Sequence, residues 1–279
     1  MESIFLIKKI IFIKIKKSIL IFKEFFSFFL DNRLKKVIKI KDKDTNKKIK
    51  IYDFGYVTRC RASKFFTKEP ETINWIKNFN KGDIFLDVGA NIGIYSLYAA
   101  NRGINTISIE PDALNNALLN LNINANLFGK KVLAFALALH DKPKYSTLNI
   151  KQIQWGGALN SFDTCKDFLN KTYLPSHRQG VFGDTMDNFL NQLGKNVSHI
   201  KIDVDGNEFL VLKGAIKTLA SKSLKTILVE LDLNHPNYKE SIDLIISNGF
   251  ELSNQFNLDT NKNKNFKKPI NHIFFRKIK

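Results

Sequence analysis

Hydrophobic and polar residues alternate in blocks along most of the chain, and these blocks predict strands that take turns with helices. Short apolar runs bounded by turn residues predict strands, whereas longer segments with a helical spacing of apolar positions predict helices. The expected strands are 84–88, 106–110, 132–138, 199–204 and 226–231, with 250–253 and 271–276 able to close the sheet. The expected helices are 92–101, 111–124, 208–219 and 241–248.

This alternation predicts an α/β fold with a mostly parallel, doubly wound sheet of seven strands, covered by helices on both faces. In such sheets, ligands bind at the carboxyl ends of the strands. Residues 145–150 are expected to form a hairpin with the strand at 132–138. Ahead of the sheet, residues 37–41 and 48–54 read as two further strands joined by a polar turn, which predicts a small β-hairpin.

Residues 3–30 are the most apolar part of the chain. Their lysines leave no charge-free run long enough to span a bilayer, and no small-residue cleavage site marks a signal peptide. The polar positions recur every seven to eight residues and would share one face of a basic amphipathic helix. Such a helix can lie on an anionic membrane surface. The alternatives are docking on the protein's own core or on a second subunit, and disorder.

The formal net charge of +18 is concentrated at the two ends of the chain. Residues 1–50 carry 15 basic and 5 acidic side chains, whereas residues 51–260 carry 22 and 21, a net charge of +1. Only six of the basic residues are arginines, the residue type that reads base edges, so no specific nucleic-acid partner is expected. Two widely separated cysteines indicate no disulfide or metal framework and suit a reducing, cytoplasmic location.

The stretch DIFLDVGANIGIYSLYAA (83–100) combines an apolar strand, two glycines and a helix. Asp87 is expected at the mouth of the sheet, where its carboxylate could hold a ligand amine. Gly89 and Gly93 bracket the turn and would let the backbone approach a ligand. Glu110 ends the next strand, where an acid can accept hydrogen bonds from a ribose diol. Together these residues predict a site for an adenosine-containing ligand.

The glycine turn departs from the dinucleotide pattern G-x-G-x-x-G, because Asn91 stands where the second glycine should be. The form D-x-G-x-x-x-G followed by an acid is similar to that of Rossmann-like S-adenosylmethionine-dependent methyltransferases. Asp87, Gly89, Asn91, Gly93 and Glu110 are therefore the candidate cofactor-binding residues.

Three long motifs and one short one resemble the FkbM-like methyltransferase family in order and spacing. They are DVGANIGIYS (87–96), EPDALNNALLNLNINAN (110–126), IKIDVDGNEFLVLKGA (200–215) and VELD (229–232). The resemblance covers residues 60–279. It implies a class I methyltransferase fold, S-adenosylmethionine as cofactor, and O-methylation of a sugar or other small hydroxylated acceptor.

The expected organisation is an N-terminal extension over 1–36 and a methyltransferase domain over 37–279, with the cofactor-binding core at about 82–279. The family pattern usually reads D-V-E-G at the third motif, and this chain has Asp205 in place of the glutamate, a carboxylate that is one methylene shorter.

Asp203, Asp205 and Glu208 lie at the end of the fourth parallel strand and at the start of its helix. Three interpretations stay open: a general base for an acceptor hydroxyl, a site for a divalent cation, or capping of the helix. No metal site is predicted from these acids. His140 follows the third strand and His235 the fifth, so both are further candidates for the base, with His140 kept among the catalytic candidates.

Residues 151–183 interrupt the alternation. Their aromatic and polar residues would suit a sugar pocket, although an ordinary surface insertion is the alternative; they are Trp155, Gly156, Gly157, Tyr173, His177 and Arg178. Two other functions compete with O-methylation. One is a nucleic-acid methyltransferase of the same fold, and the other is a non-catalytic or nicotinamide-dependent Rossmann-like protein.

Overall fold

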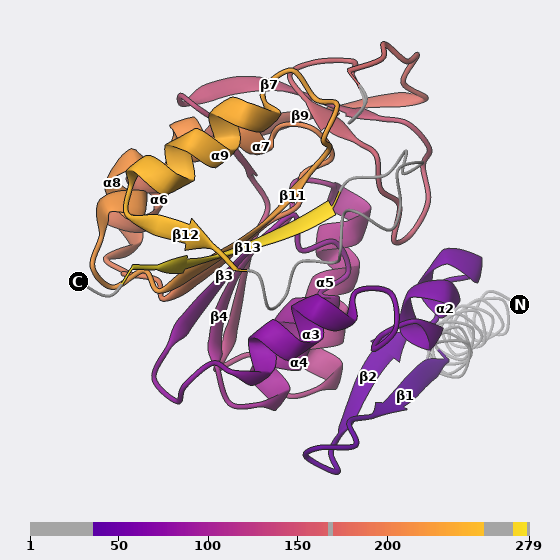
Figure 1. Cartoon of the computed structure of the whole chain (residues 1–279). Coiled ribbons are helices and arrows are strands. Elements are labelled where there is room, and N and C mark those ends of the chain that lie inside the picture. The colour runs from indigo at the N-terminus through magenta and orange to yellow at the C-terminus, as the bar shows by residue number, and fades with distance from the viewer. Residues whose placement is uncertain (1–35, 167–169, 254–269, 278–279) are drawn as a thin grey trace, which may run out of the picture.

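The computed structural model describes residues 36–166, 170–253 and 270–277. A central sheet lies between two layers of helices, and a smaller sheet flanks one of its ends (Figure 1). The predicted N-terminal extension, including the basic helix over residues 3–30, lies outside the described residues. Within the described ranges, no helix has the length and apolarity needed to cross a membrane.

The central sheet has seven strands in the order β12-β13-β11-β10-β3-β4-β5, and only β13 runs against the others. This is the α/β, mostly parallel arrangement that the sequence predicts, with residues 250–252 and 270–276 closing one edge. The strand bounds are β3 (Ile84–Val88), β4 (Asn105–Ile109), β5 (Val132–Phe135), β10 (His199–Ile202), β11 (Thr226–Leu231), β12 (Phe250–Leu252) and β13 (Ile270–Arg276).

Each strand sends alternate side chains to opposite faces, and each face is buried under its own helices (Figure 1). In β3, for example, Leu86 and Val88 enter one core and Phe85 enters the other. The first core packs against α6 (Met186–Leu193), α7 (Glu208–Lys213), α8 (Ile216–Ala220) and α9 (Tyr238–Ser247). The second packs against α2 (Tyr56–Ser63), α3 (Pro70–Lys77), α4 (Ile94–Asn101) and α5 (Ala113–Ala125).

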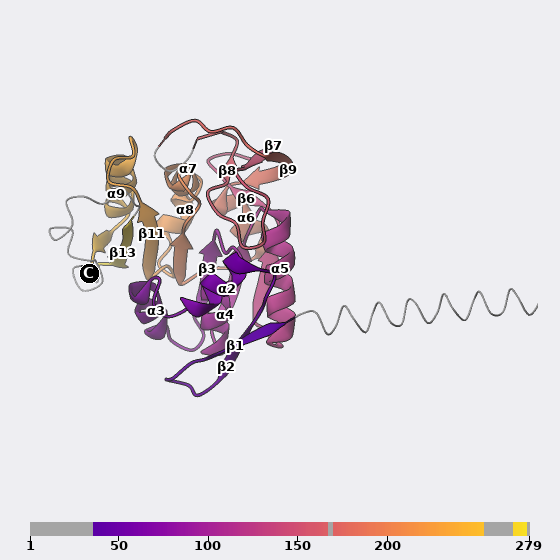
Figure 2. The same ribbon diagram turned by 90° about the vertical axis from the view of Figure 1, so that its right-hand side faces the viewer.

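A second sheet has the order β6-β9-β7-β8 and stands beside the carboxyl ends of the central strands (Figure 2). Its strands are β6 (Ala138–Leu139), β7 (Lys144–Ile150), β8 (Ser161–Phe162) and β9 (His177–Asp184). The predicted hairpin between residues 145–150 and 132–138 is therefore wrong. β7 pairs antiparallel with β8 and β9, and only β6, from the end of the predicted strand, joins this sheet, through a parallel pairing with β9.

The predicted hairpin is present as β1 (Val37–Lys41) and β2 (Lys48–Tyr52), paired antiparallel. Side-chain amides of α5 pair with the backbone of β2. Asn126 Oδ1 accepts from the Lys50 amide, Asn126 Nδ2 donates to the Lys50 carbonyl, and Asn122 Oδ1 accepts from the Tyr52 amide. Ile49 and Ile51 are fully buried in the second core, so the hairpin is fastened directly to the helical layer.

Two expected helices differ in their boundaries for local reasons. Helix α5 begins at Ala113 instead of Pro111, because the Asp112 side chain caps it by accepting from the Leu114 and Asn115 amides. The helix expected over 208–219 is split into α7 and α8 at Gly214. A Cβ at Gly214 would lie 2.1 Å from the His140 carbonyl oxygen, so the backbone can pass there only without a side chain.

Candidate functional site

The turn after β3 packs directly against the end of β10. The Gly89 and Ala90 amides both donate to the Ile109 carbonyl, at 2.9 and 3.0 Å. Gly89 has φ +82°, and a Cβ there would lie 1.8 Å from the carbonyl oxygen of Asp203. Only glycine fits this position, for reasons of both conformation and space. The glycine turn and the third motif, 114 residues apart in sequence, thus form one continuous surface.

Glu110 follows β4 and lies beside the glycine turn. Its Oε2 accepts from the Asn91 amide at 2.7 Å and its Oε1 from the Asp112 amide at 2.9 Å. Burial raises the pKa of this carboxyl to about 8, against the lowering effect of those two amides. In the ionised form of Glu110 each oxygen has two acceptor positions, so one stays free on each, and hydroxyl donors that bind there would lower the raised pKa. That is the pair of acceptors that a ribose diol requires, and the site therefore fits an adenosine-containing cofactor.

Asp87 differs from its predicted placement at the mouth of the sheet. Its side chain is buried on the face covered by α4, with 1% of the residue exposed. Oδ2 accepts from the Ser96 hydroxyl at 2.5 Å, and that hydroxyl also lies 2.7 Å from Ser108 Oγ. Burial raises the pKa of Asp87, and Oδ1 has no hydrogen-bond partner among the described residues. In this conformation Asp87 joins β3 to α4 and does not open to solvent.

A segment that we call the strap (residues 154–160) crosses the glycine turn. Its Gly157 carbonyl accepts from Asn91 Nδ2 at 2.6 Å and from Asn115 Nδ2 at 3.0 Å. The Gly156 carbonyl accepts from Arg61 Nε at 2.8 Å. These bonds join the strap to three different elements of the cofactor face. The strap therefore lies over the predicted cofactor-binding residues.

The far end of the strap is joined to the third motif. The Leu159 amide donates to Asp205 Oδ2 at 2.6 Å. Burial and the nearby charge of Asp203 raise the pKa of Asp205 to about 6. Asn91, Leu159 and Asp205 all have left-handed φ, at 51°, 66° and 56°. Strained backbone of this kind is typical of ligand clamps and switch regions, so the contacts of the strap are built from conformations that cost energy to hold.

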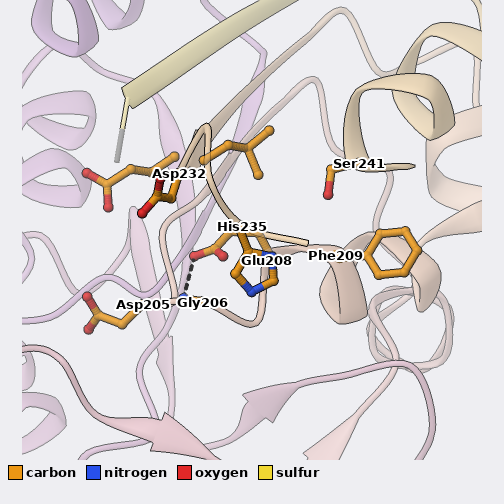
Figure 3. Close-up of a pocket in the computed structure, with 9 residues that line it drawn as sticks. Asp205, Gly206, Glu208, Phe209, Asp232, His235 and Ser241 are labelled. Carbon is orange, nitrogen blue, oxygen red and sulfur yellow. Dashed lines mark hydrogen bonds between the residues drawn. The ribbon is translucent and has the colours of Figure 1, made fainter. Parts of the chain in front are cut away.

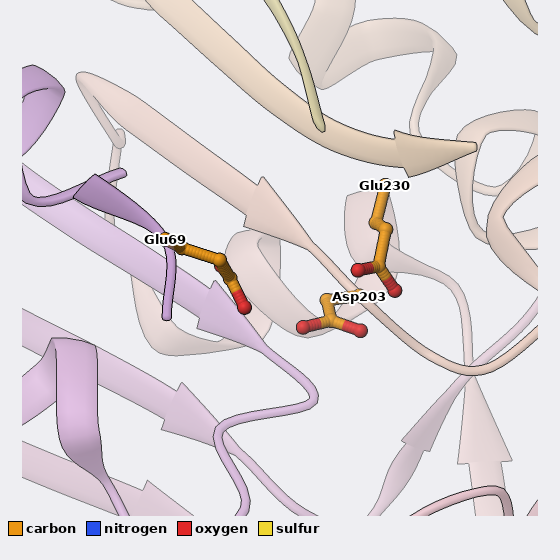
Figure 4. Close-up of side chains that lie close together, drawn as sticks. All are labelled: Glu69, Asp203 and Glu230. Carbon is orange, nitrogen blue, oxygen red and sulfur yellow. The ribbon is translucent and has the colours of Figure 1, made fainter. Parts of the chain in front are cut away.

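Three carboxyl groups, which we call the acid cluster, meet at the ends of β10 and β11: Glu69, Asp203 and Glu230 (Figure 4). At least one oxygen of each lies within 4.8 Å of the others. The cluster contains its own cation, since Lys201 Nζ donates to Asp203 Oδ2 at 2.6 Å while the lysine is 1% exposed. Lys68 Nζ also lies 2.7 Å from Glu69 Oε1. The ammonium groups of Lys201 and Lys68 thus neutralise acids that would otherwise attract a divalent cation.

The pKa values of two acids in the cluster, Asp203 and Glu230, are shifted in opposite directions. Burial raises the pKa of Asp203, but Lys201 and Lys68 outweigh this and hold it below its usual value. Burial and the charge of Asp203 raise the pKa of Glu230 well above its usual value. The pKa of Glu230 therefore lies above that of Asp203, and the two carboxyl groups share a hydrogen bond. Asp203 remains partly open to solvent, with 21% of its side chain exposed.

The remaining predicted catalytic residues occupy different positions. Glu208 Oε1 accepts from the Val204 and Gly206 amides, both at 3.1 Å, so it braces the turn between β10 and α7. His140 is 4% exposed and packs edge-on against Phe162, so its ring is buried and not open to solvent. Its Nδ1 lies 2.7 Å from Asp141 Oδ1 without hydrogen-bond geometry. His235 is half-buried near the end of β11.

The aromatic and polar residues of 151–183 are not gathered into one pocket. Trp155 packs on Phe54, with ring centroids 4.6 Å apart, and so fixes the strap to the N-terminal layer. The Tyr173 hydroxyl donates to the Asn149 carbonyl and accepts from the Ser161 amide. His177 and Arg178 are exposed on β9. Sequence reasoning instead missed Glu69, Lys201 and Glu230; an ionisable lysine within an apolar strand was the signal for Lys201.

The order of the strands, the glycine turn and the acid that follows β4 define a Rossmann-like class I methyltransferase fold. The model of the family described as "Methyltransferase FkbM domain" matches residues 87–252, more than half of the chain. This protein therefore belongs to the FkbM methyltransferase family and is an S-adenosylmethionine-dependent methyltransferase. A search of curated proteins found no match to the chain.

Several solved structures are similar in shape. The methyltransferase FkbM from Methylobacillus flagellatus KT is 14% identical with a TM-score of 0.45, over 69% of this chain and 43% of that one. The match thus spans less than half of that enzyme. A precorrin-6y C5,15-methyltransferase from Geobacter metallireducens GS-15 is 12% identical (TM-score 0.46, 78% and 92% covered). An rRNA methylase from Streptococcus thermophilus is 8% identical (TM-score 0.46, 74% and 93% covered).

Proposed function

We propose that the protein is an O-methyltransferase that acts on a hydroxyl of a sugar, a glycan or another small hydroxylated acceptor. The observation that carries this proposal is the contact between Gly89 and the carbonyl of Asp203, because it sets the predicted cofactor turn directly against a partly exposed, ionised carboxylate. A cofactor held at the turn would have its reactive end beside an acceptor for a hydroxyl proton.

Glu110 would hold the ribose hydroxyls of S-adenosylmethionine through the free acceptor positions of its two oxygens. Asn91 and the strap would cover the turn and exclude water from it. When bound, the cofactor supplies a methyl group on a positively charged sulfur. The protein then has two tasks, which are to place the acceptor oxygen in line with the methyl group and to remove its proton. Positioning supplies a large part of the rate in reactions of this kind.

Asp203 is the residue that we propose for the second task. Its carboxylate would accept a hydrogen bond from the acceptor hydroxyl and take the proton as the oxygen becomes an ether. Lys201 keeps Asp203 ionised through its hydrogen bond to Oδ2, and the Glu230 carboxyl group, whose pKa is raised, shares a hydrogen bond with Asp203.

The competing reading, a nucleic-acid methyltransferase, has less support from the site. Asp203 and Asp205 are acidic and lie at the mouth of the sheet, where their carboxylates would repel a phosphate backbone. The body between residues 51 and 260 carries a net charge of only +1.

The test combines cofactor binding with an acceptor panel. Calorimetry of the full chain should show S-adenosylmethionine binding, and Glu110→Ala should weaken it by about 1–3 kcal/mol, the range for lost hydrogen bonds to a charged group. Formation of S-adenosylhomocysteine should depend on added sugars or glycans and not on RNA. Asp203→Asn should slow this turnover while leaving cofactor affinity unchanged. Turnover with RNA alone would reject the proposal.

A further inference from the structure

A small pocket opens between the ends of β10 and β11 and the helices α7 and α9 (Figure 3). It adjoins the acid cluster, with which it shares Glu230. Its space is enough for about one water-sized group. The residues that line it are Asp205, Gly206, Glu208, Phe209, Glu230, Leu231, Asp232, His235 and Ser241.

The lining is acidic and has no cation of its own. Four of the nine residues are carboxylic acids, and neither lysine nor arginine is among them. Burial lowers the pKa of His235, so its ring is neutral at pH 7 and adds no positive charge. This contrasts with the acid cluster next to it, where Lys201 supplies an ammonium group at 2.6 Å from Asp203. The lining of the pocket therefore supplies no ammonium group of the kind that Lys201 supplies to Asp203 in the acid cluster.

One acid of the lining, Asp232, has a buried oxygen that no hydrogen-bond donor of the described residues reaches. It is 6% exposed, and its Oδ1 accepts from the Asn234 amide at 2.8 Å and from Asn234 Nδ2 at 3.2 Å. Its Oδ2 has no hydrogen-bond partner among the described residues, although the atom is buried. A buried carboxylate oxygen without a donor destabilises the protein, because it has lost its water and gained no partner. A donor that arrives with the ligand would remove that cost.

Two kinds of donor match a space of this size, a hydroxyl and an ammonium group. The acidic lining favours the ammonium group over the hydroxyl. Burial raises the pKa of Glu208 to about 7, and burial with the charge of Asp203 raises that of Asp205 to about 6. These groups resist ionisation because burial outweighs every opposing effect, including the charges of Arg61 and Lys68 near Asp205. A cation would lower their pKa values and be bound by the charges that appear, whereas a hydroxyl offers no such gain.

We propose that this pocket binds an ammonium group of the methyl acceptor, so that the acceptor is an amino alcohol such as an amino sugar with a free amine. The inference rests on the proposed function, because it places the acceptor's amine beside the carboxylate that would receive its hydroxyl proton. An N-acylated amine is neutral and too large for the space, and a uronic acid or phosphorylated sugar would be repelled.

Binding to the full chain distinguishes these acceptors without turnover. Glucosamine, N-acetylglucosamine and glucose are titrated by calorimetry in a buffer free of Tris, itself an ammonium ligand. Glucosamine should bind about tenfold more tightly than the other two, a difference of 1.4 kcal/mol. Its binding should release protons as Glu208 and Asp205 ionise, which shows as a dependence of the heat on the buffer. Asp232→Asn should remove most of the preference, whereas Asp243→Asn, on the exposed face of α9, should retain it.

Equal affinity for the three sugars, or no binding of glucosamine, overturns the inference. So does magnesium chloride that binds stoichiometrically and displaces glucosamine, since the pocket would then be a metal site. Binding of S-adenosylmethionine and its loss in Glu110→Ala are measured separately. Their success beside equal sugar affinities would leave the proposed function standing, whereas their failure would remove the proposed function whatever the sugars do.

Discussion

The backbone amide of Leu159 donates a 2.6 Å hydrogen bond to Asp205 Oδ2, and both residues hold left-handed backbone conformations. This bond joins the strap to the third motif, so one carboxylate takes part both in the acidic pocket and in closing the site. Asp205 occupies the position where the family pattern has glutamate. The shorter side chain is matched here by a backbone amide that comes close to it.

Loss of this bond should loosen the strap. In Asp205→Ala, hydrogen exchange of the amides at residues 156–160 should speed up by about tenfold, as a charged hydrogen bond worth about 1.5 kcal/mol or more is removed. Asp205→Asn keeps a carbonyl oxygen and should show a smaller increase. Asp243→Ala, on an exposed helix face, serves as the control. Unchanged exchange in Asp205→Ala would show that the strap is held without this residue.

Gly89→Ala should abolish cofactor binding and destabilise the fold. The added Cβ would lie 1.8 Å from the Asp203 carbonyl, and the residue has a φ of +82°. The end of β10 must move, so the melting temperature should fall by several degrees, as it does for losses above about 1 kcal/mol. Gly129→Ala, an exposed site where a Cβ meets nothing within 4 Å, should melt like the wild type. Normal cofactor affinity in Gly89→Ala would contradict the packing described.

Lys201→Met should be strongly destabilising. The substitution retains the length of the side chain but leaves Asp203 and Glu69 without the buried cation that faces them. Removing one partner of a buried ion pair costs about 3–5 kcal/mol. Urea unfolding should therefore show a much lower midpoint for Lys201→Met. The double variant Lys201→Met with Asp203→Asn should recover part of the loss, because the stranded charge is removed as well; strict additivity would refute a direct interaction.

Glu208 gives a stability effect with a defined direction in pH. Its pKa is raised from the usual 4.5 to about 7 in the folded protein, so the folded state binds more protons than the unfolded chain between these values. Stability is then lost as pH rises, by up to about 3 kcal/mol above pH 7. Glu208→Gln cannot ionise and escapes this loss. Its stability relative to the wild type, from urea unfolding, should grow between about pH 4.5 and about pH 7 and level off above that; a constant difference would exclude the shifted pKa.

The central sheet was predictable because its strands are short apolar runs bounded by turn residues. The bounds of β3 and β11 match the expected 84–88 and 226–231. β9 was missed since His177–Asp184 has no apolar alternation of its own and is a strand only through its pairing with β7. Helices α2, α3 and α6 were missed as well. The sheet partner of residues 145–150 is a strand whose paired residues lie 27 to 37 positions further along the chain.

For the candidate site, the strands and turns that carry the residues were predictable, whereas the placement of several side chains was not. Asp87 was placed on the correct strand, but both faces of a parallel sheet are buried, so sequence alternation does not tell which face opens to a ligand. Glu69 reaches the acid cluster from a loop 134 residues before Asp203. Asp232 ends the VELD motif and was quoted only as part of it. Its importance lies in an oxygen left without a donor, which only the three-dimensional structure shows.

The hairpin of β1 and β2 has a consequence for association between molecules. A two-stranded sheet normally presents open backbone edges that can pair with a strand of another chain. Here Asn122 of α5 and the C-cap residue Asn126 give the backbone groups of Lys50 and Tyr52 the partners that a third strand would offer. These side-chain amides take the hydrogen-bonding positions of a neighbouring strand, so this edge of β2 is blocked against pairing with a strand of another molecule.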